Sequence, residues 1–149
     1  MKRCLFRPFY IRKNYKGRKT EQEFAEFLDA QETVDWWMKN GDSGKDFLSI
    51  RYESSEDGET HLFYPDWIVH YYDGTIGIYD TKGGITASSQ DTHDKANELQ
   101  RRIKILNGWN RENIRYIGGI VCKRNGMWML NKEPQYSYQS RSMDEWEQM

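Results

Sequence analysis

The sequence predicts one domain of mixed α/β class, with a β-sheet flanked by helices. Two segments, 21–30 and 92–106, carry apolar residues at helical spacing. The segments between and after them are rich in β-branched and aromatic residues, which are typical of strands. A length of 149 residues is enough for one domain with a substantial core. We therefore expect a single domain over 1–149, with a basic segment 1–19, a core of about 20–131 and a polar tail 132–149.

The basic segment precedes the first predicted helix. Residues 4–11 are predicted to form a short strand. Pro8 places this strand at a sheet edge or bends it. Residues 12–19 are a polar connector. The segment before Thr20 contains no Asp or Glu, so it is either a solvated arm or a surface that contacts phosphates. Its basic residues are Lys2, Arg3, Arg7, Arg12, Lys13, Lys16, Arg18 and Lys19.

The first helix is predicted from Glu21 to Ala30. Thr20 is a suitable N-cap, and Glu23 three residues later completes the pattern of a capping box. Phe24 and Leu28 lie on one helical face, and Glu21 shares that face because it precedes them by three and seven positions.

Four strands are predicted in the middle of the chain, with 61–64 leading into the last two. They are 34–38, 47–52, 67–72 and 75–79. The last two strands flank Asp73-Gly74, a strong hairpin signal. A two-residue turn would pair Tyr72 with Thr75 and would place Asp66 and Asp80 on opposite faces. A three-residue loop, with Gly74 in the left-handed conformation, would pair Asp66 with Asp80.

We favour the three-residue loop because it gathers the isoleucines of the hairpin on one face. That face would then carry Asp66, Asp80 and Lys82 at its charged end. Two carboxylates and an ammonium are sufficient for a hydrolytic Mg²⁺ site. The alternative is a solvated surface pair of Asp80 and Lys82, worth under ~1 kcal/mol. His70 falls on the same face, and we interpret it as structural or peripheral.

The second helix is predicted from residue 92 to Leu106, with Asp91 or Thr92 as its cap and Asn107-Gly108 at its end. A strand pair, 114–123 and 127–130, follows around Asn125-Gly126. The aromatic tail after Pro134 either packs or frays.

Composition excludes several classes of protein. The net charge is −1, so the whole molecule is not a basic DNA-binding protein. No run approaches the ~18 apolar residues that span a bilayer, and no signal peptide is visible. We therefore expect a cytoplasmic protein with no membrane partner. The two cysteines lie far apart in apolar runs, which predicts buried thiols. Three scattered histidines have no zinc-ligand spacing.

The order of elements and two short strings together resemble a known family. The strings are Tyr64-Pro65-Asp66 and Asp80-Thr81-Lys82, supported by segments 20–28, 36–41 and 76–79. They resemble the PD-(D/E)XK nuclease superfamily, and most closely the C-terminal endonuclease domain of type III restriction enzyme Res subunits. The resemblance covers roughly residues 5 to 125. It implies a restriction-endonuclease-like, three-layer core, in which helices flank a central mixed sheet.

The resemblance also implies a function and a site. Asp66, Asp80 and Lys82 match the family motif, with Asp where many relatives have Glu, and Glu21 is our choice for the helix carboxylate, with Glu23 left as the alternative. Asp66 and Asp80 would hold Mg²⁺, or Mn²⁺ in its place, with Glu21 and the Thr81 carbonyl as further ligands. The expected activity is DNA phosphodiester hydrolysis, and the expected partners are DNA, a helicase/ATPase region and a modification methyltransferase subunit. The chain contains no helicase motif of its own.

Candidate DNA contacts lie in two basic groups outside this motif. For the arginines of the second helix the default interpretation is a solvated face, whereas for the N-terminal group phosphate contact and a solvated arm both remain open. Two other functions remain open, a catalytically silent nucleic-acid-binding module and a protein-interaction scaffold. The candidate contacts are Arg12, Lys13, Lys16, Arg18, Lys19, Arg101 and Arg102.

Overall fold

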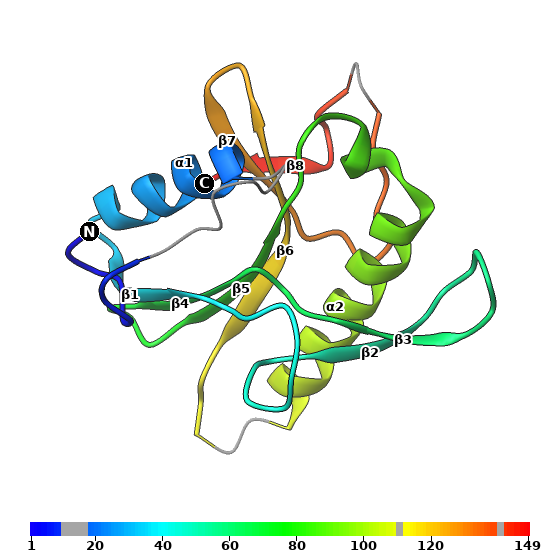
Figure 1. Cartoon of the computed structure of the whole chain (residues 1–149), viewed down its shortest axis with the longest axis horizontal. Helices are drawn as coiled ribbons and strands as arrows, with labels where there is room; N and C mark the ends of the chain where they lie inside the picture. The colour runs from blue at the N-terminus through cyan, green and yellow to red at the C-terminus, as the bar shows by residue number, and fades with distance from the viewer. Residues whose placement is uncertain (10–17, 110–111, 140–141) are drawn as a thin grey trace.

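The computed structural model describes residues 1–9, 18–109, 112–139 and 142–149. It is a mixed α/β domain built on a mixed six-stranded sheet and two α-helices (Figure 1). The helices are α1 (Arg18–Ala30) and α2 (Gln90–Gly108), with a short 3-10 helix, η1 (Gly84–Ser88), before α2. None of the helices in these ranges is long and apolar enough to cross a membrane.

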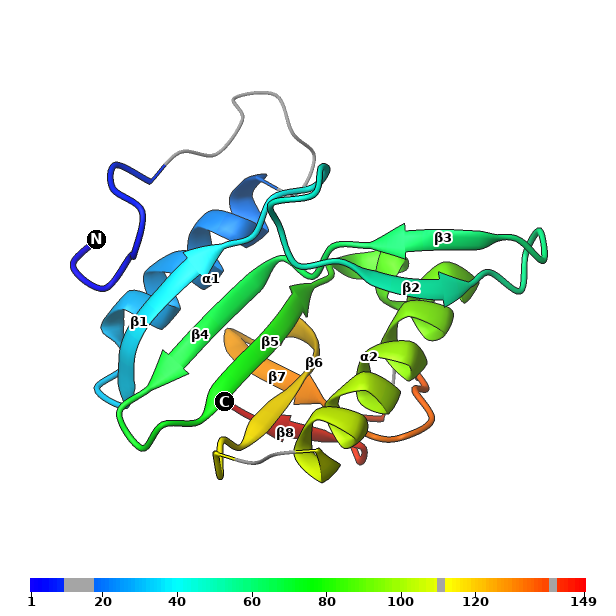
Figure 2. The ribbon, with the colours of Figure 1, turned by 90° about the horizontal axis from the view of Figure 1, so that it is seen from below.

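The sheet has the order β1-β4-β5-β6-β7-β8. Its strands are β1 (Val34–Lys39), β4 (Trp67–Tyr71), β5 (Ile76–Thr81), β6 (Tyr116–Arg124), β7 (Met127–Asn131) and β8 (Trp146–Gln148). Only β5 and β6 pair in parallel, and α2 forms the crossover between them. The remaining neighbours are antiparallel. A separate antiparallel ribbon, β2 (Ile50–Glu53) and β3 (Thr60–Phe63), projects beyond the sheet beside α2 (Figure 2).

The two helices cover opposite faces of the sheet (Figures 1 and 2). The apolar face of α1 packs Phe24 and Leu28 against Trp67 and Tyr79 of the hairpin. On the other face, Leu99 and Ile103 of α2 pack with Ile78 and with residues of the β2–β3 ribbon. The same helix meets β6 through Ala96, Ile120 and the buried Cys122. The core is therefore divided into two layers by the sheet.

The β4–β5 hairpin has the three-residue loop that the sequence favoured. Trp67 pairs with Tyr79, and the Tyr71 amide donates to the Thr75 carbonyl at 2.9 Å. The Gly74 amide closes the loop on the Tyr71 carbonyl at 2.9 Å, and Gly74 has a φ of +86°. This conformation suits glycine because it lacks a Cβ. The predicted register is confirmed, and it aligns Asp66 with Asp80 across the strands.

Several predicted boundaries were wrong for local reasons. Helix α1 begins at Arg18, so Thr20 lies within the helix instead of capping it. Ser89, and neither Asp91 nor Thr92, is the N-cap of α2, because its hydroxyl accepts the Thr92 amide at 3.1 Å.

The tail after Pro134 packs: Tyr136 and Trp146 are buried, and β8 extends the sheet.

Two predicted strands differ from the structure. Residues 10 and 11 of the strand predicted over 4–11 lie outside the described residues, and the described residues 1–9 hold one isolated bridge, between Cys4 and Trp37, in its place. Pro8 has no amide hydrogen to donate to a ladder. Strand β2 begins at Ile50 and not at residue 47. There the Asn40 side chain bonds both the amide and the carbonyl of Leu48, which replaces strand pairing.

Two glycines in β6 allow its neighbours to approach closely. A Cβ on Gly118 would lie 2.0 Å from the Ile78 carbonyl oxygen, and one on Gly119 would lie 1.9 Å from the Asn131 carbonyl oxygen. Gly119 also has a φ of +154°. Because both obstacles are backbone atoms of adjacent strands, a side chain here would force the strands apart.

We expect Gly119→Ala to lower the free energy of unfolding by about 3 kcal/mol, the upper end of the range for overpacked cores. Urea denaturation followed by circular dichroism measures this change. Gly108→Ala is the matched control: nothing lies within 4 Å of its added Cβ, and its effect should stay within ~1 kcal/mol. Equal losses in the two variants would contradict the packing argument.

Candidate functional site

The candidate site lies at the end of the sheet where β1 and β5 finish and β4 begins. Both β1 and β5 run antiparallel to β4, so their final residues, Lys39 and Thr81, lie at the same end of the sheet. Trp67 begins β4 at this end. This topology brings three of the four predicted catalytic residues together, and α1 adds the fourth. We call the resulting group the sheet-end cluster; it consists of Glu21, Lys39, Asp66, Asp80 and Lys82.

Asp66 is held by bonds to both of its carboxylate oxygens. Its Oδ2 accepts the Thr81 amide at 2.9 Å and the Thr81 hydroxyl at 2.7 Å. Its Oδ1 accepts Lys39 Nζ at 3.0 Å. The Trp67 indole donates to the same Thr81 hydroxyl at 3.3 Å, which orients it from the α1 side. Thr81, predicted to act through its carbonyl, therefore joins the cluster through its amide and hydroxyl.

Asp80 is the most deeply buried acid of the cluster, with 2% of its surface exposed. Its Oδ2 forms an ion pair with Lys82 Nζ at 2.8 Å, and among the described residues no other donor reaches this oxygen. Burial and then the charge of Asp66 raise its pKa to about 7, against the opposing charge of Lys82. Lys82 thus offsets only part of the cost of burying this carboxylate beside Asp66, and a bound cation would offset more of it.

Glu21 is the helix carboxylate that reaches the cluster. It is 5% exposed, and its Oε1 lies 3.5 Å from Lys39 Nζ. Burial raises the pKa of Glu21, Lys39 opposes that shift, and Asp66 adds to it. The alternative residue, Glu23, instead pairs with Lys123 at 2.9 Å. Of the two glutamates that the sequence left open, only Glu21 contacts the cluster.

Lys39 is a member of the cluster that the sequence analysis did not assign. Its ammonium lies between Glu21 and Asp66, and it sits 5.3 Å from the centre of the Trp67 ring. Burial lowers its pKa, but the charges of Asp66 and Glu21 outweigh burial and the pKa is raised overall. The only sequence signal is a lysine at the end of a predicted strand. Its meaning depends on β1 pairing with β4, which the sequence does not reveal.

The start of α2 contributes further charged side chains whose charges act on Asp80. Lys95 pairs with Asp91 at 2.6 Å and lies 5.7 Å from the ring centres of Tyr52 and Phe63. Its charge is among those that lower the pKa of Asp80. The Tyr52 hydroxyl donates to Asp91 at 2.6 Å. The ribbon and α2 therefore fix a further lysine near the cluster.

The predicted DNA contacts are only partly placed by the structure. Arg12, Lys13 and Lys16 lie outside the described residues. Arg18 and Lys19 are exposed at the start of α1. Arg101 and Arg102 both pair with Glu98, at 2.6 and 3.0 Å, so one carboxylate offsets only part of their combined charge. They line a polar groove of about 500 Å³ between α2 and the β2–β3 ribbon.

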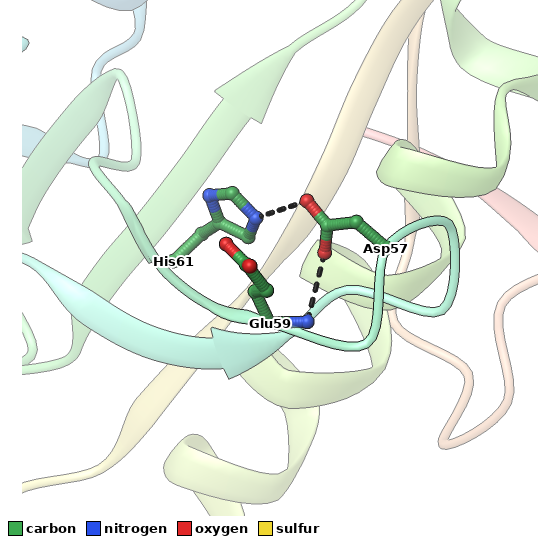
Figure 3. A group of neighbouring side chains, drawn as sticks. All are labelled: Asp57, Glu59 and His61. Carbon is green, nitrogen blue, oxygen red and sulfur yellow. Dashed lines mark hydrogen bonds and ion pairs between the residues drawn. The ribbon is translucent and has the colours of Figure 1, made fainter.

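A second group of potential metal ligands lies at the exposed tip of the β2–β3 ribbon. Figure 3 shows Asp57, Glu59 and His61, whose ligand atoms lie within 4.8 Å of one another. Asp57 accepts the Glu59 amide and contacts His61 Nε2, both at 2.8 Å. The Glu59 amide first, and then His61, lower the pKa of Asp57. These internal bonds account for the geometry of the group without an ion.

The sheet-end cluster differs from that group in composition and spacing. Among the described residues, Glu21, Asp66 and Asp80 do not bring three carboxylate oxygens within 4.8 Å of one another. Lys39 separates Glu21 from Asp66, which leaves Asp66 and Asp80 as the nearest match to a divalent ion. The carboxylate oxygens of Asp80 and the remaining lone pair on Oδ1 of Asp66 are hard oxygen ligands of the kind that Mg²⁺ prefers.

Comparisons with protein-family models, with curated proteins and with solved structures gave no match to this chain. The geometry and electrostatics of the sheet-end cluster are therefore what point to a function.

Proposed function

We propose that this chain is a Mg²⁺-dependent endodeoxyribonuclease domain with a PD-(D/E)XK site and a restriction-endonuclease-like core. The observation that carries the proposal is the register of the β4–β5 hairpin, which places Asp66 opposite Asp80 one step beyond the Trp67–Tyr79 pair, with Lys82 Nζ 2.8 Å from Asp80 Oδ2. The element order agrees with it: a helix, an antiparallel β1-β4-β5 sheet, a crossover helix and a parallel strand. The β2–β3 ribbon is an addition to that order.

Asp66 and Asp80 are the residues that would hold the ion. When bound there, Mg²⁺ would polarise the scissile phosphate and lower the pKa of a coordinated water. Asp66 is already oriented by Thr81, and Asp80 is already buried, so neither acid has to be ordered at the moment of binding. Glu21 contributes negative charge next to this pair while bound to Lys39.

Lys82 would act on the reacting groups directly. Its ammonium is fixed by Asp80 and 22% of its side chain is exposed, so it can reach a phosphate at the mouth of the cluster. There it would orient the attacking water and offset the negative charge that develops on the phosphate. Lys95 lies beyond Asp80 and would add positive potential for a DNA backbone. A helicase region and a methyltransferase subunit are the partners proposed for the intact system.

Nicking of supercoiled plasmid in Mg²⁺ or Mn²⁺ tests the proposal. We expect Asp80→Ala and Lys82→Ala each to lower the nicking rate by a factor of about 10² or more, because each removes charge stabilisation at the reacting phosphate. Chelation should abolish nicking in the wild-type protein.

Lys132→Ala is a matched control, because it removes a lysine from an exposed ion pair with Glu147 on β8. It should nick at the wild-type rate. DNA binding without nicking, in either metal, would favour the silent nucleic-acid-binding module. Absence of both binding and nicking would favour the interaction scaffold. Nicking that persists in Asp80→Ala would exclude this cluster as the active site.

A further inference from the structure

Lys39 occupies the position between two carboxylates where a second metal ion would otherwise bind. We propose that its ammonium is the permanent cation of Glu21 and Asp66, and that the sheet-end cluster therefore takes one divalent ion, held by Asp66 and Asp80. This inference deepens the proposed function and rests on it. It assigns Lys39 as a positioning residue and Glu21 as its partner, not as a metal ligand.

The distances support this assignment. Lys39 Nζ lies 3.0 Å from Asp66 Oδ1 and 3.5 Å from Glu21 Oε1, so one ammonium serves both acids. Its position is fixed by pairing of Lys39 with Trp67 in the ladder and by the Trp67 ring at 5.3 Å. An ammonium held by two carboxylates and an aromatic face is not easily displaced.

Burial explains why these acids need a resident cation. Glu21 is 5% exposed, and the Lys39 side chain is 24% exposed. A buried, unpaired carboxylate beside a second one is costly, because each repels the other and neither is fully solvated. Lys39 removes that cost before any metal arrives. Lys39 forms ion pairs with Glu21 and Asp66, whereas Asp80 pairs with Lys82 at 2.8 Å, so we assign the divalent ion to Asp80 together with Asp66.

The expected result is a change in the number of bound ions. Manganese binding, measured by electron paramagnetic resonance of free Mn²⁺ near neutral pH, should give one ion per wild-type chain. Lys39→Met should bind two, because Glu21 and Asp66 then lack a cation and can recruit a second ion. The double variant Lys39→Met/Glu21→Gln should return to one. Lys39→Arg, which keeps the charge, should also bind one.

Lys123→Met is the matched control, because it removes the lysine from the surface pair with Glu23 on the same helix. It should bind one ion. Circular dichroism establishes that each variant is folded. Two ions on the wild-type chain, or one ion on folded Lys39→Met, would overturn the inference while leaving the metal site in place. No bound ion on the wild-type chain would remove the proposed function itself, and the inference with it.

A single variant tests the same idea without touching Lys39. Glu21→Gln in the wild-type background should change Mn²⁺ affinity by no more than about twofold, because Glu21 is not a ligand. A loss of affinity of about tenfold or more would show that Glu21 coordinates the ion, and would overturn the assignment.

Discussion

Asp80→Asn is expected to gain stability relative to the wild-type protein as the pH rises from about 4 to about 7. The reason is the buried carboxyl group, whose pKa is raised from 3.8 to about 7 by burial and by the charge of Asp66. In the folded protein Asp80 keeps its proton through this range, whereas in the unfolded chain it loses it. Unfolding therefore releases a proton from Asp80, and the contribution of this residue to stability falls as the pH increases.

The size of the effect follows from the pKa difference. One pKa unit corresponds to about 1.4 kcal/mol, so the contribution of Asp80 approaches ~4 kcal/mol once the pH exceeds both values. It is absent below about pH 4, where the carboxyl is protonated in both states. The asparagine variant has no carboxyl proton to lose, so its free energy of unfolding should lack this contribution. The absolute difference in free energy of unfolding between the two proteins also depends on Lys82. The prediction therefore concerns how that difference changes with pH.

Urea denaturation at a series of pH values measures this slope. Asp46→Asn, which replaces an exposed acid, should follow the wild-type curve at constant distance. Mg²⁺ added above pH 7 should stabilise the wild-type protein, because a ligand that binds only the folded state raises the free energy of unfolding. It should not stabilise Asp80→Asn, which lacks the carboxylate proposed to hold the ion. A difference between wild type and Asp80→Asn that does not vary with pH would show that Asp80 is ionised normally.

Trp67→Ala is expected to lower the free energy of unfolding by about 3–5 kcal/mol, the range for truncating a buried aromatic residue. Trp67 is fully buried, and its ring meets Phe24 at 5.5 Å and Trp37 at 5.7 Å between centres. The same ring lies beneath Lys39, and its indole bonds Thr81. Its loss should therefore weaken both the α1 layer and the support of Asp66.

Trp109→Ala provides the comparison of equal size. Trp109 is 81% exposed, and its removal should change stability by less than ~0.5 kcal/mol. Trp67→Phe separates packing from hydrogen bonding, because it keeps an aromatic ring but loses the indole donor to Thr81. We expect it to cost about 1–2 kcal/mol. Thermal and urea unfolding followed by circular dichroism measure all three variants. Equal stability of Trp67→Ala and Trp109→Ala would contradict the packing described above.

Local chemistry made much of the hairpin predictable. Asp73-Gly74 marks the turn, and the alternation of isoleucines selects the register, because a one-residue slip would move every side chain to the other face. The structure has that register, with Gly74 at positive φ. Glu21 was also predictable, because its spacing from Phe24 and Leu28 places it on the buried face of α1. These inferences needed only neighbours along the chain.

Helix ends were harder to predict, because several hydroxyl and carboxyl side chains compete for the same amides. Ser89 caps α2 although Asp91 and Thr92 were equally plausible from the sequence. Thr20 lies inside α1, which begins two residues earlier at Arg18. The choice depends on where the preceding backbone enters the helix, and this is determined by the packing of the whole domain.

Residue types and short-range spacing were sufficient to indicate two acids and a lysine at one end of a hairpin. Strand order was not available from them, and strand order is what brings Lys39 from the end of β1 to a position between Glu21 and Asp66. Burial was equally hidden, yet it raises the pKa of Asp80. Both depend on contacts between residues far apart in the chain, so only the folded structure could decide how the charges of the cluster are balanced.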